Sequence, residues 1–473
     1  MSQVERSFPS ERALLKSRNK KTFDRVDLTD VVWLRPLFEN PWPLFIARSI
    51  TLAVFAITIL AGLIGTPVGN HNFAIIFVWI AWWTALKLLF IPLGGRSWCS
   101  LCPIAVPGEW LQHGGLIGKR QSHRIASLRW PKKLRGTWLQ TALFVVIGMF
   151  SAVTLTDPRV TAWILLGLFS LALVLGLTFE QRAFCKFICP IGGFSALYAR
   201  TSPLELRVKN IEACLTHREK TCYQECPWGL YPVAFRDASQ CGLCLECLRV
   251  CPKDNIALSL RSFGQDLRSD HVKWSLDEAF LTLIMLGSAL SFAVVFNGPW
   301  GSLKNAAYAI GSPQWFVYSA GYLALNLVIL PALFVLSIWS ESQPSFSYRK
   351  EVFYNMLTSR AKILIPLGLF AWIAFTISFA LPKFDYVLNV LSDPFGWGWD
   401  LFSTASSTFS PNLTAFSPMI QVVLLLIGLI WSLSIHHHQL EAMPARPSAW
   451  WRNIPMPLFM VVYTNTILWL LVG

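Results

Sequence analysis

Residues 361–381 read AKILIPLGLFAWIAFTISFAL, an apolar stretch in which Lys362 is the sole charged residue. About 20 consecutive apolar residues suit a helix that crosses a lipid bilayer. Eight further stretches share this property, and they lie near 43–66, 72–93, 136–156, 159–179, 275–296, 314–338, 417–435 and 454–472. Buried helices of a soluble core would explain one or two such stretches, but not all of them. The sequence therefore predicts a mainly α, polytopic helical membrane protein with about nine transmembrane helices.

The composition of the chain favours the same class. Hydrophobic residues make up 54% of the 473 residues and charged residues 14%, whereas soluble domains carry about 25% charged residues. Residues 1–42 are polar and basic, and the apolar segment after them is too long for the core of a signal peptide. The net charge of +14 would suggest nucleic acid as the partner of a soluble protein. Here the charges flank apolar stretches, so we expect membrane lipid and no nucleic acid.

The distribution of Lys and Arg predicts the orientation. With the N-terminus inside, the inner segments hold 35 of the 40 Lys and Arg residues, and these segments are 1–42, 94–135, 180–274, 339–362 and 436–453. Arg48 and Lys87 lie near span ends, where long side chains can snorkel to the headgroups. The asymmetry satisfies the positive-inside rule. We therefore expect a multi-pass protein of the bacterial cytoplasmic (inner) membrane, with the N-terminus and all eleven cysteines on the cytoplasmic side, where disulfides are disfavoured.

The most specific motif of the chain is Cys241-Gly-Leu-Cys244-Leu-Glu-Cys247-Leu-Arg-Val-Cys251-Pro252. Its spacing is that of the bacterial ferredoxin run, in which three cysteines bind one iron–sulfur cluster and the fourth binds a second cluster. Zinc is the alternative, but zinc sites prefer two Cys-x2-Cys pairs that are separated by a longer loop. The motif therefore predicts 4Fe–4S clusters within an inserted, ferredoxin-like domain at 200–262.

A two-cluster ferredoxin needs a second half, which Cys222-x3-Cys226-Pro227 supplies. We expect Cys226 to complete the cluster of Cys241, Cys244 and Cys247, and Cys251 to complete the cluster of Cys214 and Cys222. The second cluster then lacks one cysteine. His217 stands where the spacing would place it, and histidine replaces cysteine at some iron–sulfur sites. A surface role for His217, a three-iron cluster and a nearby carboxylate such as Glu219 remain as alternatives.

Two further cysteine pairs follow apolar stretches directly. Cys99-x2-Cys102-Pro103 follows the second predicted span, and Cys185-x3-Cys189-Pro190 follows the fourth. Both spans end on the predicted inner face, so the four thiolates can meet around a third cluster at the membrane edge. Two independent buried pairs are the alternative. Arg96 and Arg182 each lie three residues before the first cysteine of a pair, and glycines follow both pairs, which indicates an internal repeat.

These residues resemble those of a known family. The segments Arg96-Ser-Trp-Cys99-Ser-Leu-Cys102-Pro103 and Phe184-Cys185-Lys-Phe-Ile-Cys189-Pro190-Ile-Gly192 are similar to the paired membrane motifs of the NapH/NosR-type polyferredoxins. The stretch from Cys214 to Cys251 is similar to their cytoplasmic ferredoxin domain. Family members usually have Cys-x3-Cys-Pro in both membrane motifs and a cysteine in place of His217. The resemblance implies electron transfer to or from respiratory enzymes, often linked to quinol.

The predicted organisation has four parts: a basic cytoplasmic segment at 1–42, a four-helix membrane domain at 43–199, the ferredoxin-like domain at 200–262 and a five-helix membrane domain at 263–473. The expected cofactors are about three 4Fe–4S clusters and a quinone. No haem is expected, because no intramembrane histidines are placed to hold one.

Two functions fit the sequence. The first is a relay of electrons between the quinone pool or a cytoplasmic donor and a respiratory partner, for example as the quinol dehydrogenase subunit of a larger complex. The second is an assembly or maturation factor that reduces metal for a respiratory metalloenzyme. A redox-responsive regulator is a third reading, but no recognisable output domain supports it.

Overall fold

The computed structural model describes residues 25–113, 128–217, 219–269, 274–341, 349–406, 412–441 and 453–473. Within them, eight helical segments are long and apolar enough to cross a membrane. They are α3 (Trp42–Ile64), Phe73–Gly94 (α4 to α6), α11 (Pro158–Thr178), α18 (Leu276–Asn297), Pro313–Trp339 (α20 and α21), Phe353–Lys383 (mainly α22 and α23), Thr414–Glu441 (mainly α25) and α26 (Pro455–Val472). The predicted class, a polytopic helical protein, is thereby confirmed.

The remaining predicted span, 136–156, differs from the others. It is divided into α9 (Trp138–Met149) and α10 (Ser151–Thr154), because Phe150 between them has non-helical backbone angles. Neither piece alone has the length of about 20 residues that a span requires. The sequence pattern could not reveal this break, since the stretch is apolar throughout.

The helices and strands have the following bounds. The long segments are built from α4 (Phe73–Ile75), α5 (Trp83–Ala85), α6 (Ile91–Gly94), α20 (Pro313–Ala324), α21 (Leu330–Glu341), α22 (Arg349–Ala361), α23 (Leu364–Ala380) and α25 (Ser417–Glu441). The shorter helices are α2 (Arg35–Glu39), α7 (Trp98–Leu101), α8 (Val106–His113), α12 (Ala183–Phe187), α13 (Pro190–Tyr198), α14 (Ile211–Thr216), α15 (Thr221–Gln224), α16 (Glu246–Arg249), α17 (Gln265–Arg268), α19 (Gly301–Tyr308) and α24 (Asp385–Ser392). The strands are β1 (Val26–Asp27), β2 (Leu204–Val208) and β3 (Ile256–Leu260).

Sequence-local signals explain where the spans begin. Pro158 occupies the first turn of α11, and the carboxylate of Asp157 accepts hydrogen bonds from the first free backbone amides. At the start of α18, Ser275 and Glu278 form a reciprocal capping box. Both caps satisfy amide groups that lipid could not hydrogen bond.

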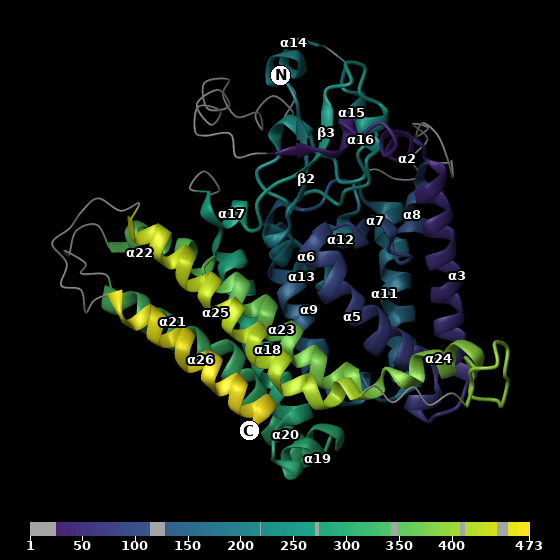
Figure 1. Cartoon of the computed structure of the whole chain (residues 1–473), viewed down its shortest axis with the longest axis vertical. Coiled ribbons are helices and arrows are strands. Elements are labelled where there is room, and N and C mark those ends of the chain that lie inside the picture. The colour runs from purple at the N-terminus through teal and green to yellow at the C-terminus, as the bar shows by residue number, and fades with distance from the viewer. Residues whose placement is uncertain are drawn as a thin grey trace.

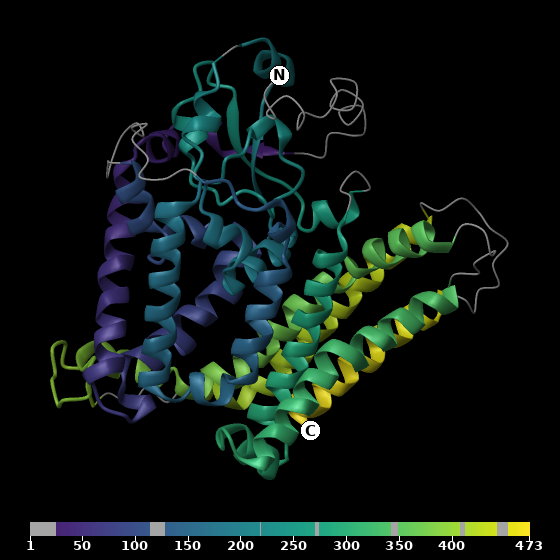
Figure 2. The same ribbon diagram turned by 180° about the vertical axis from the view of Figure 1, so that it is seen from behind.

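The bundle carries the predicted insert at one end (Figure 1). Seen from behind, α3, α9 and α11 form one part beneath the insert, while α18, α21, α25 and α26 run obliquely beside it (Figure 2). The residues of α18 and α23 are mostly buried, whereas few residues of α3 and α11 are buried and most of them are at least partly exposed. This contrast fits central helices and lipid-facing helices of one bundle.

The insert is organised around a small antiparallel sheet with the strand order β1-β3-β2. Leu260 of β3 pairs with Val26 on one side and with Leu204 on the other. The first strand therefore comes from the N-terminal segment 1–42, although the sequence predicts that segment as separate from the insert.

Candidate iron–sulfur cluster sites

The first group of cysteines lies where two helical segments end beneath the insert. This membrane-edge set comprises Cys99, Cys102, Cys185 and Cys189. Cys99 and Cys185 are both buried and belong to one packed cluster, against which Cys189 also packs. Burial raises the pKa of Cys102 to about 11 and that of Cys185 to about 12, and the neighbouring thiols of the set contribute to both shifts. The structure thus brings the two predicted motifs together.

The backbone around this set is sharply turned. Gly95 has a φ of 58° and Arg182 a φ of 44°, so each lies in the left-handed region three or four residues before a cysteine. A positive φ is uncommon for a residue other than glycine. The Arg182 guanidinium donates to the backbone oxygen of Cys99 and forms an ion pair with Glu109, with Nε 2.9 Å from Oε2. These contacts hold the first motif against the second.

The second group, the middle set, comprises Cys226, Cys241, Cys244 and Cys247. Burial raises the pKa of Cys244 to about 12, with Cys226 as the next contributor, and the pKa of Cys247 is raised by burial and by all three other members. Leu243 and Leu245 have φ values of 54° and 62°, so the chain curls around the cysteines. The amide of Leu243 donates to Sγ of Cys241 at 3.4 Å. Cys226 joins this set although it lies well upstream of the other three.

The third group, the distal set, comprises Cys214, Cys222 and Cys251. The pKa of Cys222 is raised to about 11 by burial and then by Cys214 and Cys251. His217 follows α14 directly, and its buried Nδ1 atom has no hydrogen-bond partner. Glu219 is exposed. This placement is consistent with His217 as the missing ligand, which stays a prediction.

The chemistry of these sets fits clusters better than single ions. All eleven cysteines lie in described residues and are free thiols. Among the described residues, no three His, Cys, Asp or Glu side chains converge as one metal ion would require. A four-iron cluster is larger and is held by cysteines spread around it. The raised pKa values of Cys102, Cys185, Cys222 and Cys244 mean that these four thiols would not ionise unaided at neutral pH, so bound iron must displace their protons.

Unpaired donors near the membrane-edge and middle sets support this fit. Nε and Nη2 of Arg96 and Nε1 of Trp228 are buried without hydrogen-bond partners. Leaving such donors unpaired costs about 1–3 kcal/mol each, and more for a charged group. A cluster with four thiolates carries negative charge and accepts hydrogen bonds at its sulfurs. Such a group would satisfy these donors.

A cavity of about 470 Å³ lies beside the membrane-edge set. All four cysteines of that set line one end of it, and Leu155 and Thr161 line it near the opposite end of α11. Its wall is almost entirely apolar and aromatic, and includes Trp82 and Trp83. Its volume falls in the range of about 300–1,000 Å³ that is typical of sites for small molecules.

The helix that forms one wall of this cavity is irregular. Within Phe73–Gly94, the segments Ile76–Trp82 and Leu86–Phe90 are π-helical. Such widened turns are rare and often occur at functional sites. They help to direct successive tryptophans of one helix toward the cavity, a feature that hydrophobic periodicity could not reveal.

Two basic residues were placed wrongly from the sequence. Arg48 and Lys87 were expected to snorkel, yet both are buried. Arg48 donates through Nε to the backbone oxygen of Ser100 at 2.8 Å. Lys87 has no exposed surface, and its Nζ lies 4.7 Å from the ring centre of Trp83 and 5.3 Å from that of Trp372. The ammonium group of Lys87 therefore lies against aromatic rings and not among lipid headgroups.

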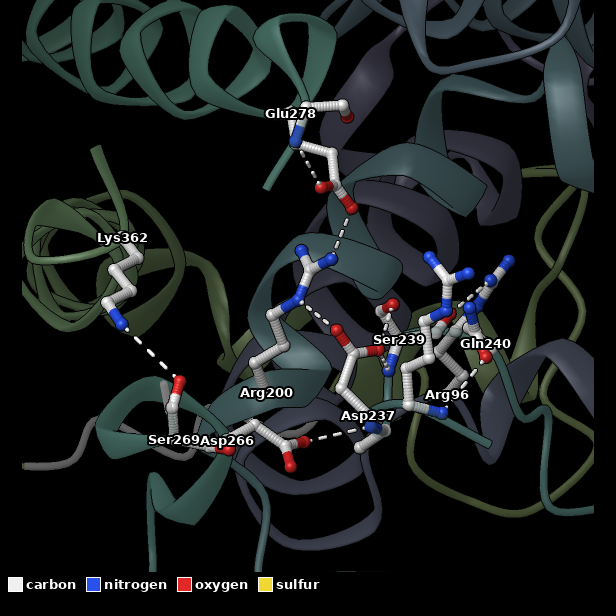
Figure 3. A network of polar contacts seen from close by, with 12 residues as sticks. Arg96, Arg200, Asp237, Ser239, Gln240, Asp266, Ser269, Glu278 and Lys362 are labelled. Carbon is white, nitrogen blue, oxygen red and sulfur yellow. Dashed lines mark hydrogen bonds and ion pairs between the residues drawn. The ribbon is translucent and has the colours of Figure 1, made fainter. Parts of the chain in front are cut away.

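A buried polar network attaches the insert to the bundle (Figure 3). Arg200 pairs with Asp237 at 3.0 Å and with Glu278 at the start of α18, and its guanidinium lies 4.2 Å from the ring centre of Trp274. The other oxygen of Asp237 accepts from the amide and hydroxyl of Ser239. The network therefore fixes the loop that leads into the middle set.

We expect Asp237→Asn to loosen this junction. Burial alone would raise the pKa of Asp237, but Arg200 and Ser239 outweigh it and lower the pKa. The stabilisation is therefore present above the ordinary carboxyl pKa of about 3.9 and is lost as the pH falls through the lower folded value. Removing one charge of a buried pair costs about 3–5 kcal/mol, so thermal unfolding in detergent at pH 7 should occur at a clearly lower temperature.

Asp254→Asn is the matched control, because Asp254 pairs with Arg35 but its side chain is 61% exposed. It should change the unfolding temperature little, since exposed pairs contribute about 0–1 kcal/mol. Equal effects of the two substitutions would contradict the role given to the buried network.

The helical bundle and its cysteine sets define a membrane protein of ferredoxin type with 4Fe–4S-binding motifs. Comparison with known families and proteins confirms this class. The family model of a 4Fe-4S binding domain matches residues 75–123 and 161–212. The two matches contain the two membrane-edge motifs, in agreement with the internal repeat, and neither reaches the ferredoxin run.

Among curated proteins, an uncharacterized protein of Methanocaldococcus jannaschii is 26% identical over 238 residues, which are 48% of this chain and 87% of that protein. The methylamine utilization ferredoxin-type protein MauN of Paracoccus denitrificans is 30% identical over 151 residues, 30% of this chain and 52% of MauN. YccM of Escherichia coli, named as a candidate electron transport protein, is 28% identical over 138 residues, 28% of this chain and 36% of YccM. No solved structure matches the chain significantly.

The chain spans about half of MauN and about a third of YccM. Within these limits, the comparisons support an iron–sulfur electron-transfer role in a membrane setting. The number of clusters, the ligand assignment and the partners are proposals.

Proposed function

We propose that the chain relays electrons between a quinone in the membrane and a redox partner on the side of the insert, through three 4Fe–4S clusters. Cys99, Cys102, Cys185 and Cys189 hold the first of them. The middle set holds the second, and the distal set, with His217, holds the third. When bound, the clusters supply one-electron redox chemistry, whose potentials depend on the charges and hydrogen bonds around them.

The cavity beside the membrane-edge set is the observation that carries this proposal. A quinone is an apolar ring with a lipid-soluble tail, and the cavity offers an apolar, aromatic wall that ends at four cysteines. Its ring would approach the cysteines from within the bundle, next to the first cluster. The wall residues would exclude water while the chain holds the ring in place.

The order of the sets supports a relay toward the insert. Cys226 of the middle set packs against the cluster of side chains that contains Cys99 and Cys185. Cys222 and Cys251 of the distal set pack with Cys241 and Cys247 in a second cluster of side chains. Cys214 lies in α14, at the far end of the insert in Figure 1. This end suits contact with a soluble partner or another subunit.

The distribution of basic residues supports a cytoplasmic position for the insert, as the sequence analysis predicts. We place the chain in the bacterial cytoplasmic membrane on this ground. Protease accessibility of the insert in right-side-out and inverted vesicles would test the orientation, because cleavage should occur only in inverted vesicles.

Filling the cavity should block the reaction with quinol. Ala81 lines the cavity, and Ala81→Phe adds a ring there without adding charge. We expect anaerobic reduction of the clusters by a short-chain quinol to slow at least tenfold, while reduction by dithionite stays complete. The measurement is stopped-flow absorbance of the purified protein in detergent.

Val174→Phe is the matched control, because Val174 is 57% exposed on α11 and faces away from the packed interior. It should leave the quinol rate unchanged. If wild-type clusters are reduced by dithionite but never by quinol, the relay is wrong, and the alternative of an accessory protein that reduces metal for a partner gains support.

A further inference from the structure

We infer that Arg96 and Trp228 form the electron-transfer contact between the membrane-edge set and the middle set, with Arg96 as the cation that sets the potentials on both sides. The inference rests on the proposed function in assuming that both sets hold clusters. It does not depend on quinone as the substrate.

Trp228 lies between the two sets. Its side chain is 1% exposed and packs in one cluster with Cys99 and Cys185, against which Cys226 also packs. On its other side it meets the ferredoxin run, because a Cβ atom added to Gly242 would lie 2.4 Å from Nε1 of the indole. Gly242 separates Cys241 from Cys244, so the ring touches the loop that encloses the middle set. A tryptophan that contacts both sets provides a packing route between them.

Arg96 stacks on this ring. Its guanidinium carbon lies 4.4 Å from the ring centre of Trp228, whereas that of Arg182 lies 5.7 Å away. Arg96 is 5% exposed, and Nη1 donates to the backbone oxygen of Ser239 at 2.6 Å. Since Nε and Nη2 have no partner, two charged donors remain for anionic groups on either side of the ring.

The charge of Arg96 reaches both sets. The backbone oxygen of Arg96 accepts from the amide of Cys99 in the membrane-edge set at 2.9 Å, and its guanidinium is bound to Ser239, two residues before Cys241 of the middle set. A cation favours the more negative, reduced form of a nearby iron–sulfur group, and buried charges are weakly screened. Arg96 therefore raises both potentials in the same direction.

Arg182 differs from Arg96 in its partners. It already pairs with Glu109, so much of its charge is neutralised locally. Arg96 is held through Ser239, which the Asp237–Arg200 network positions (Figure 3). The same network that attaches the insert thus fixes the cation at the contact.

The test is a redox titration of the purified full-length protein with dithionite, followed by electron paramagnetic resonance. In Arg96→Gln, the midpoint potentials of two cluster signals should shift downward, while that of the third, assigned to the distal set, stays in place. Arg96→Lys should restore part of the shift, because it keeps the charge but loses the planar fork that stacks on the ring. Iron content should remain that of the wild type in both variants.

Arg207→Gln is the control, since Arg207 lies on β2 of the same insert with its side chain 34% exposed and pairs with Glu205. It should shift none of the three signals. If Arg96→Gln does not assemble, Trp228→Phe replaces it, because the phenyl ring keeps the packing and removes the Nε1 donor, and the same two signals should fall. Unchanged potentials in the variant measured, or an equal shift of all three, would overturn the inference. A shift in two signals with no reduction by quinol would retain this contact and reject the quinone relay alone.

Discussion

Replacing Cys226 by serine should remove the middle cluster and leave the other two in place. Cys226 contributes to the raised pKa of Cys241, Cys244 and Cys247, whereas the thiols that contribute most to that of its sequence neighbour Cys222 are Cys214 and Cys251. A three-cluster protein holds about twelve irons, so the variant should retain about eight. Because the middle set lies between the other two, electrons from the membrane-edge set should no longer reach the distal set.

The paired variant is Cys251→Ser. Cys251 belongs to the ferredoxin run in sequence but lies in the distal set. The variant should therefore remove the signal of the distal cluster and leave that of the middle cluster. Iron and sulfide analysis with electron paramagnetic resonance distinguishes the two variants. Loss of the same signal in both would show that the crossed ligand assignment is wrong.

Lys87→Met should stabilise the protein. Lys87 is fully buried within the span Phe73–Gly94, and its Nζ has no hydrogen-bond partner. A lysine within a membrane helix costs up to about 2.5–3.5 kcal/mol on insertion scales, and stacking on Trp83 and Trp372 returns about 2 kcal/mol. Methionine has similar length and no charge, so we expect a gain of about 1 kcal/mol and a higher unfolding temperature in detergent.

Lys383→Met provides the comparison. Lys383 also lies over an aromatic ring, with Nζ 4.4 Å from the centre of Phe379, but it is only partly buried at the end of its span. Its substitution should change the unfolding temperature little. A clear loss of stability in Lys87→Met would mean that the contact of the cation with the rings of Trp83 and Trp372 contributes more free energy than burial of the charge costs.

The sequence could predict the parts of this molecule that depend on local patterns. A long apolar stretch indicates a transmembrane helix, because few other backbone structures are stable in lipid. The spacing of Cys241, Cys244 and Cys247 indicates that their thiolates bind one cluster, because the short loops between them must fold around a common point. The grouping of Cys226 with them followed from the ferredoxin pattern, and the structure places these residues together, although ligation itself stays a prediction.

Other features depend on packing between segments that are distant in the chain, and such packing cannot be predicted from a single sequence. The cavity exists because side chains of several helices fail to fill the space between them. Lys87 lies near the end of its apolar stretch, so snorkelling was the natural expectation. Its burial depends on Trp372 from a helix that follows much later in the chain. The break at Phe150 likewise lies within an uninterrupted apolar run.

The pairing of Val26 with Leu260 has a consequence for biogenesis. A ribosome adds about 5–20 residues per second, so the first strand waits roughly ten to fifty seconds for its partner. During that interval, the early spans enter the membrane while the cysteines of the insert emerge in turn. The sheet can close only after the last of these cysteines has been made. This delay defines a period in which cluster-delivery machinery can reach thiols that the finished fold buries.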